Sequence, residues 1–193
     1  MRFLLTAVNA KYIHSNPAVY SLQAYACQED PTLKEQIFVA EYTINQQMED
    51  VLADLYEQKP DVIGFSCYIW NISYIEKLVR ELKKLLPQVQ IWLGGPEVSF
   101  DAEKVMEEYP QLTGIMLGEG EQTFLELAQH YRSGESGESG EEALSRIAGL
   151  AIRKNGKVIL TGPRVLTDLS AIPFLYDDLK KFENKILYYE SSR

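Results

Sequence analysis

Residues 91–97 read IWLGGPE, and residues 115–121 read IMLGEGE. In each stretch a short apolar run ends in glycines, which is typical of a strand buried on both faces of a parallel sheet. Ligands of open parallel sheets bind at the carboxyl ends of the strands, and glycine there lets a large ligand approach the backbone. The two turns therefore predict a broad ligand that lies across the edge of the sheet.

The same alternation of strand and helix extends to both sides of these turns. Five apolar runs predict strands, at residues 3–8, 37–40, 62–66, 89–93 and 115–117. A helix is expected after each, with starts at Asn16-Pro17, at Asn45 and at the capping box Ser73-x-x-Glu76, and then over 101–108 and 122–131. Repeated strand–helix units with right-handed crossovers predict an α/β fold: a doubly wound, flavodoxin-like (Rossmann-like) five-stranded parallel sheet with helices on both faces.

The chain divides into four predicted parts. Residues 1–132 form the α/β domain, and 133–146 are rich in Ser, Gly and Glu, which predicts a flexible, solvated loop. Residues 147–161 predict a β-hairpin around Asn155-Gly156, a type I′ turn signal. Residues 162–193 are expected to be an extended linker, and its strand-like end predicts that the natural chain continues.

Composition narrows the class of partner. The 193 residues carry a net charge of −9, with basic residues scattered among acidic ones, which argues against a nucleic-acid partner. No apolar run approaches the roughly 20 residues of a membrane span. The two cysteines, Cys27 and Cys67, form no CxxC pair or His/Cys cluster, so neither a zinc site nor a disulfide framework is expected. We expect a cytoplasmic protein.

Four loops should meet at the carboxyl edge of the predicted sheet. Their candidate binding residues are Asn9, Ala10, Tyr12, His14, Ser15 and Asn16 after the first strand, Ser66, Cys67, Tyr68, Trp70 and Asn71 after the third, Gly94, Gly95, Pro96 and Glu97 after the fourth, and Gly118, Glu119, Gly120, Glu121 and Thr123 after the fifth. These loops offer amide, hydroxyl and aromatic groups. Tyr68 and Trp70 either stack on a ligand or close the domain edge, and the sequence leaves both readings open.

The usual catalytic motifs are missing from these loops. There is no GxxxxGK[ST] or GxSxG, and Gly118-x-Gly120-x-x-Thr123 only approximates a dinucleotide fingerprint. A phospho-receiver needs acidic residues where this chain has Asn9 and Ser66. The acidic residues at 97, 119 and 121 could be paired for acid–base chemistry, but carboxylates near helix starts are better explained by the helix dipole. We predict no catalytic residue and no metal ligand.

The motifs together resemble a known family. The five-unit frame, the two glycine turns at 94–97 and 118–121, and the tail DLSAIPF at 168–174 resemble the N-terminal cobalamin-binding domain of cobalamin-dependent radical S-adenosylmethionine enzymes. Within that group the chain is similar to the branch of the anaerobic magnesium-protoporphyrin IX monomethyl ester oxidative cyclase. The resemblance covers nearly all of the chain.

The resemblance implies cobalamin, with its nucleotide tail between sheet and loops, Ser66 bonded to the benzimidazole and Gly94-Gly95 letting it pass. The corrin ring would lie over the strand ends, against the first loop, Tyr68, Trp70, Glu97 and residues 118–121. It also implies a C-terminal radical domain, absent here, that carries S-adenosylmethionine and a 4Fe-4S cluster on a CxxxCxxC motif. Residues 188–193 resemble the run just before that motif. The chain would then be the cobalamin module of an enzyme for methyl transfer or oxidative cyclisation, not catalytic alone.

The first loop departs from the pattern of methionine-synthase-type cobalamin domains, which carry DxHxxG after strand one, SxL after strand three and GG after strand four. Gly94-Gly95 and Ser66 keep parts of this pattern, but residues 9–16 contain no Asp-x-His. We therefore do not assign His14 as the lower axial ligand of cobalt. The alternative prediction is a flavodoxin-like docking or substrate-selecting domain that binds no cofactor. Neither the substrate nor the oligomeric state is indicated.

Overall fold

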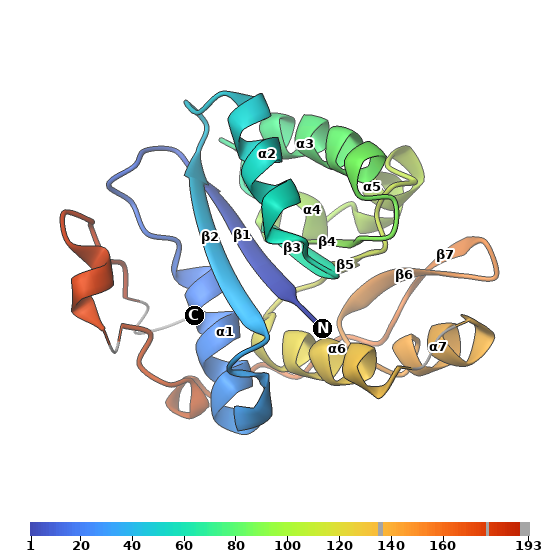
Figure 1. The fold of residues 1–193 in the computed structure, drawn as a ribbon. Helices are drawn as coiled ribbons and strands as arrows, with labels where there is room; N and C mark the ends of the chain where they lie inside the picture. The colour runs from blue at the N-terminus through green and yellow to red at the C-terminus, as the bar shows by residue number, and fades with distance from the viewer. Residues whose placement is uncertain (135–136, 177, 190–193) are drawn as a thin grey trace.

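A mixed sheet forms the centre of the protein in the computed structural model, which describes residues 1–134, 137–176 and 178–189. Across this described part of the chain, seven strands lie in the order β2-β1-β3-β4-β5-β6-β7 (Figure 1). The first five pair in parallel and match the predicted strands: β1 (Phe3–Asn9), β2 (Ile37–Thr43), β3 (Val62–Ser66), β4 (Gln90–Gly94) and β5 (Gly114–Met116). The predicted doubly wound α/β fold is confirmed.

The predicted hairpin, β6 (Leu150–Lys154) and β7 (Lys157–Leu160), extends this sheet instead of standing apart from it. β6 pairs antiparallel with β5, with Ile152 opposite Gly114. Because an unpaired strand edge exposes backbone donors and acceptors, the hairpin satisfies the edge of β5.

Helices cover both faces of the sheet (Figure 1). One face carries α1 (Pro17–Glu29), α6 (Glu121–Ser133) and α7 (Gly137–Leu144), and the other carries α2 (Met48–Gln58), α3 (Ile72–Leu85), α4 (Pro96–Ser99) and α5 (Ala102–Glu108). Three short 3-10 turns complete the described elements: Pro31–Leu33, Leu169–Ala171 and Leu179–Phe182. A separate apolar core fills each side of the sheet. Among the described residues, no helix is long and apolar enough to cross a bilayer.

The helix starts test the capping predictions. α1 begins as predicted: the Asn16 side chain accepts a hydrogen bond from the Ala18 amide at 3.1 Å, and Pro17 takes the first helical position. The predicted capping box at Ser73 is wrong, because α3 already begins at Ile72. Asn71 precedes it, and its side chain points to strand carbonyls instead of capping the helix.

The predicted flexible loop at 133–146 is corrected by α7, which covers Gly137–Leu144; residues 135–136 lie outside the described chain. Contacts with the hairpin explain the helix. The Lys154 ammonium lies 2.5 Å from a Glu142 carboxylate oxygen, and the Asn155 amide donates to Glu141 at 3.0 Å. Tertiary ion pairs thus order a segment whose own composition favours disorder.

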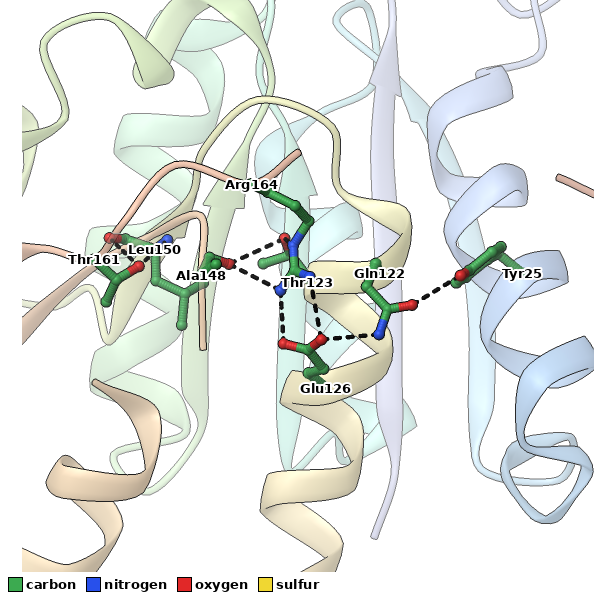
Figure 2. A network of polar contacts seen from close by, with 8 residues as sticks. All are labelled: Tyr25, Gln122, Thr123, Glu126, Ala148, Leu150, Thr161 and Arg164. Carbon is green, nitrogen blue, oxygen red and sulfur yellow. Dashed lines mark hydrogen bonds and ion pairs between the residues drawn. The ribbon is translucent and has the colours of Figure 1, made fainter. Parts of the chain in front are cut away.

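After β7 the chain turns back along α1 and α6 as an extended tail (Figure 1). Figure 2 shows its first attachment: the Arg164 guanidinium forms a two-pronged pair with Glu126 of α6, at 3.1 and 2.6 Å. Arg164 also donates to the Thr123 hydroxyl and to the Ala148 carbonyl. Further along, Lys185 pairs with Glu41 at 3.0 Å. These contacts hold the predicted linker against the α/β domain.

Candidate functional site

A cavity of about 690 Å³ opens at the carboxyl edge of the parallel strands. Residues of α1 line it on one side, and residues of the tail line it as well. The strands and the turns that follow them contribute Leu5, Gly64, Phe65, Ser66, Tyr68, Gly94, Gly95, Pro96, Ser99, Met116, Gly118, Glu119, Gly120 and Glu121; α1 contributes Pro17, Ala18, Val19, Ser21 and Leu22; and the tail contributes Leu169, Ser170, Ile172, Pro173, Phe174, Leu175 and Tyr189. The cavity therefore reaches Ser66 at the end of β3.

The two glycine turns line this cavity and form its rim. Gly95 has φ +108, and a Cβ there would lie 2.4 Å from the Cys67 carbonyl oxygen, so no side chain fits. Gly118 has φ +68 and nothing within 4 Å of a would-be Cβ. Close backbone packing requires glycine at position 95. At position 118 the lack of a side chain leaves free space at the rim of the cavity.

Ser66 lies at the end of β3, just inside the rim. Its hydroxyl oxygen accepts a hydrogen bond from the Asn16 side-chain amide at 3.2 Å. Because a hydroxyl that accepts a hydrogen bond keeps its own proton, Ser66 can still donate to a ligand. Asn16 thus joins the first and third loops and orients the hydroxyl of Ser66, which was a predicted binding residue.

Two acidic side chains belong to the rim. Glu121, only 2% exposed, is the first residue of α6 and accepts a hydrogen bond from the Ser21 hydroxyl at 2.7 Å. Glu119 accepts one from the Thr167 amide at 2.5 Å and so ties down the tail. Both carboxylates hold elements of the cavity wall together.

The remaining predicted residues do not line the cavity. They are Asn9, Ala10, Tyr12, His14, Ser15, Asn16, Cys67, Trp70, Asn71, Glu97 and Thr123. Most of the first loop is held by other protein groups: Glu41 accepts hydrogen bonds from the Asn9 side chain and from the Asn16 amide. The His14 ring stacks on Tyr188 of the tail and is hydrogen-bonded to its hydroxyl.

Several of these residues have clear structural roles. Fully buried Asn71 donates to the Val8 and Ser66 carbonyls at 3.0 and 2.9 Å, which ties the ends of β1 and β3 together. Cys67 is buried, and burial raises the pKa of its thiol, so it remains a protonated apolar filler. Thr123 bonds to Ala148 and Arg164 behind the cavity (Figure 2).

Tyr68 and Trp70 were expected either to stack on a ligand or to close the domain edge. Tyr68 and Trp70 stack on each other with ring centroids 4.5 Å apart and planes 6° from parallel. Tyr68 lines the cavity, whereas Trp70 does not. The two rings therefore pack on each other, and only Tyr68 reaches the cavity.

Sequence reasoning missed the α1 wall of the cavity, several strand residues and the tail. Gly64 lines it from the middle of β3, and the signal was present, since glycine inside an apolar strand marks a close approach to the backbone. The tail residues gave only a weak signal, the apolar run at 172–174. Among the described residues, no cluster of His, Cys, Asp or Glu suits a metal ion.

Comparison with known proteins decides the family. The B12 binding domain model matches residues 5–128, which span β1 to α6 and include both glycine turns. The chain belongs to the B12-binding domain family. This confirms the resemblance stated from the sequence motifs.

The relatives of this B12-binding domain are longer proteins, and the chain matches only a part of each. An uncharacterized methyltransferase of Pyrococcus horikoshii is 29% identical over 131 residues, which cover 67% of this chain and 27% of that protein. The cobalamin-dependent radical SAM methyltransferase TokK of Streptomyces tokunonensis is 34% identical over 42% of this chain and 11% of its own length. The anaerobic magnesium-protoporphyrin IX monomethyl ester cyclase of Cereibacter sphaeroides is 25% identical over 58% of this chain and 18% of its own.

A solved structure extends the likeness to the fold. The cobalamin-dependent S-adenosylmethionine radical enzyme OxsB superposes on 93% of this chain with a TM-score of 0.68 and 18% identity, over 25% of the OxsB chain. At that identity the likeness concerns the fold alone. The chain matches 27%, 11% and 18% of the length of these three curated relatives, so it spans less than a third of each.

Proposed function

We propose that this chain binds cobalamin and serves as the cobalamin module of a cobalamin-dependent radical S-adenosylmethionine enzyme for methyl transfer or oxidative cyclisation. The observation that carries the proposal is the cavity that descends from the two glycine turns past Ser66 to Gly64. Its volume, about 690 Å³, lies in the range of small-molecule sites, and its walls are mostly apolar with a few hydroxyl and carboxylate groups.

The residues present fit the nucleotide tail of cobalamin. A flat base can enter between α1 and the sheet because Gly94 and Gly95 leave no side chains at the entrance and Gly64 leaves none below it. Ser66 would hold the base, because its hydroxyl has a proton to donate to a ring nitrogen. The corrin ring, too broad for the cavity, would lie on the rim over residues 94–97 and 118–121, next to Tyr68.

Bound cobalamin supplies a cobalt centre for methyl transfer or one-electron chemistry, and the protein supplies binding and orientation. His14 does not line the cavity and is engaged by Tyr188, so we propose that it does not hold the cofactor. We further propose that a radical domain with S-adenosylmethionine and an iron–sulfur cluster belongs to the rest of the enzyme, because TokK and OxsB are both cobalamin-dependent radical S-adenosylmethionine enzymes.

The alternative, a docking domain without cofactor, is disfavoured by the cavity. A domain that binds nothing at this edge gains no stability from an open, largely apolar crevice, since empty space forfeits packing contacts.

Gel filtration of the chain with excess hydroxocobalamin tests the proposal. The visible absorbance of the corrin should co-elute with the protein. Ser66→Ala should weaken binding by roughly 2- to 12-fold, because one hydrogen bond to the ligand contributes roughly 0.5–1.5 kcal/mol. Ser73→Ala, at an exposed position on α3, is the matched control and should bind like the wild type. A colourless protein peak at saturating cobalamin would overturn the proposal.

A further inference from the structure

The inner end of the cavity differs chemically from its rim. Leu5 of β1 lies opposite Gly64 of β3 in the sheet register, and Gly64 lies opposite Trp92 of β4. This level is two residues, roughly 7 Å, below Ser66. The side chains that face α1 and α6 here are apolar, whereas the hydroxyl and carboxylate groups lie on the strand end, the first residue of α6 and the facing turn of α1.

Below Gly64 the interior is almost completely filled by apolar side chains. A void of only about 10 Å³ remains there, which is at the limit of what one water molecule needs. Phe3, Trp92 and Phe124 surround it, and the rings of Phe3 and Phe124 meet edge to face at 6.3 Å. The Trp92 indole N–H already donates to the Tyr131 hydroxyl at 2.9 Å. A group that reaches this floor therefore meets apolar surface.

The backbone of β3 has no free hydrogen-bonding group to offer a ligand at the level of Gly64. β3 lies between β1 and β4, so its amides and carbonyls are used in the two parallel ladders. A polar edge of a ligand at Gly64 would lose its hydrogen bonds to water and find none in return, which is costly. A methylated aromatic edge would instead gain from burial there.

We propose that the cavity selects cobamides whose lower base is a benzimidazole over those with a purine base, and that Gly64 sets how deep the base can enter. This inference rests on the proposed function. The benzimidazole of cobalamin carries methyl groups on the edge farthest from its ribose link, whereas adenine carries ring nitrogens and an amino group there. Only the methylated edge of the benzimidazole is apolar like the floor of the cavity.

Gly64 is suited to this role because an alanine there would fit the folded protein. The same alanine would occupy space that the ligand needs. A Cβ on Gly64 would lie 3.4 Å from Leu5 Cδ2, an ordinary van der Waals contact, and the backbone has no positive φ. The added methyl group would occupy cavity space on the face toward α1. Gly64→Ala should therefore leave the thermal unfolding midpoint unchanged or slightly raised, and should shorten the cavity.

Equilibrium binding of the chain to cobalamin, adeninylcobamide and base-free cobinamide tests the inference. Cobalamin should bind at least tenfold more tightly than either of the others, which corresponds to about 1.4 kcal/mol. In Gly64→Ala the preference of cobalamin over cobinamide should fall at least fivefold while cobinamide affinity stays unchanged. Gly162→Ala, with nothing within 4 Å of its Cβ and outside the cavity, should keep the wild-type order.

The outcomes separate this inference from the proposed function. If adeninylcobamide binds as tightly as cobalamin, and both bind better than cobinamide, the base enters the cavity but the proposed selection is wrong. If all three bind equally, the base does not use the cavity, and both the selection and the placement of the tail are wrong. If none binds, the proposed function itself fails.

Discussion

Gly95 is the residue on which the geometry of the rim most depends. Its φ of +108 belongs to a region that side-chain-bearing residues avoid, and its Cα faces the Cys67 carbonyl across a gap too small for a methyl group. The Cys67 amide also donates to the Gly94 carbonyl at 2.7 Å, so the third and fourth loops are packed backbone to backbone. The rim is thus rigid at the point where a ligand would pass.

Gly95→Ala should therefore lower the free energy of unfolding by roughly 1–3 kcal/mol, through the strained φ and the clash with Cys67. Urea denaturation followed by circular dichroism measures this. Gly162→Ala, in open space and without positive φ, should change the free energy of unfolding by less than about 0.5 kcal/mol. Equal stability of the two variants would show that the turn has room to relax.

Residues whose role is decided by local chemistry were predictable from the sequence. The Asn16-Pro17 helix start depends on φ preferences and a nearby hydrogen bond, and it is confirmed. The glycine turns lie after β4 and β5 and line the cavity, and their binding of a ligand stays a prediction. Asn71 and Cys67 were placed in the correct loop, but whether they face a ligand or the core depends on distant strands. Single-sequence patterns contain no information on that orientation.

At the level of elements, the tail is held to α6 by Arg164. Its guanidinium pairs with both Glu126 oxygens and also reaches Thr123, while Gln122 links Glu126 to Tyr25 of α1 (Figure 2). Burial alone would raise the pKa of Glu126, but the hydrogen bonds from Arg164 and Gln122 and the charge of Arg164 lower it below its usual value. The network joins three segments that are distant in sequence.

Arg164→Gln should destabilise the protein by about 1–3 kcal/mol at pH 7, because charged hydrogen bonds to Glu126 are lost. A carboxyl whose pKa is lowered by folding stabilises above its unfolded pKa, ~4.3, and loses that contribution as pH falls through the lower folded value. The difference between wild type and variant should therefore shrink below about pH 4.5. Urea titrations at pH 7, 5 and 3.5 measure it, and a difference independent of pH would contradict the role given to this pair.

The elements that the sequence predicted wrongly are those ordered by tertiary contacts. Residues 137–144 have the composition of a flexible loop, yet Lys154 and the Asn155 amide bind α7 to the hairpin. The hairpin itself was predictable from Asn155-Gly156, but its pairing with β5 was not, because a turn signal does not say which sheet edge the hairpin joins.

In the molecule as a whole, the cavity is an assembly of distant parts. Strand ends, the first helix and the tail beyond residue 161 each contribute a wall, and the family match ends at residue 128. The sequence predicted the sheet and the edge where a ligand should bind, since strand–helix alternation determines both. It did not predict that residues 169–175 close the site, because that contact joins segments about 150 residues apart and leaves no local pattern.

We propose above all that the nucleotide tail of cobalamin would enter this cavity, which no histidine lines among the described residues. Electron paramagnetic resonance of protein-bound cob(II)alamin tests this most directly, because an axial nitrogen splits the cobalt lines and its removal abolishes that splitting. We predict a spectrum without nitrogen splitting for the bound cofactor, beside a split spectrum for free cob(II)alamin at neutral pH. A bound spectrum that keeps the nitrogen splitting would contradict the account.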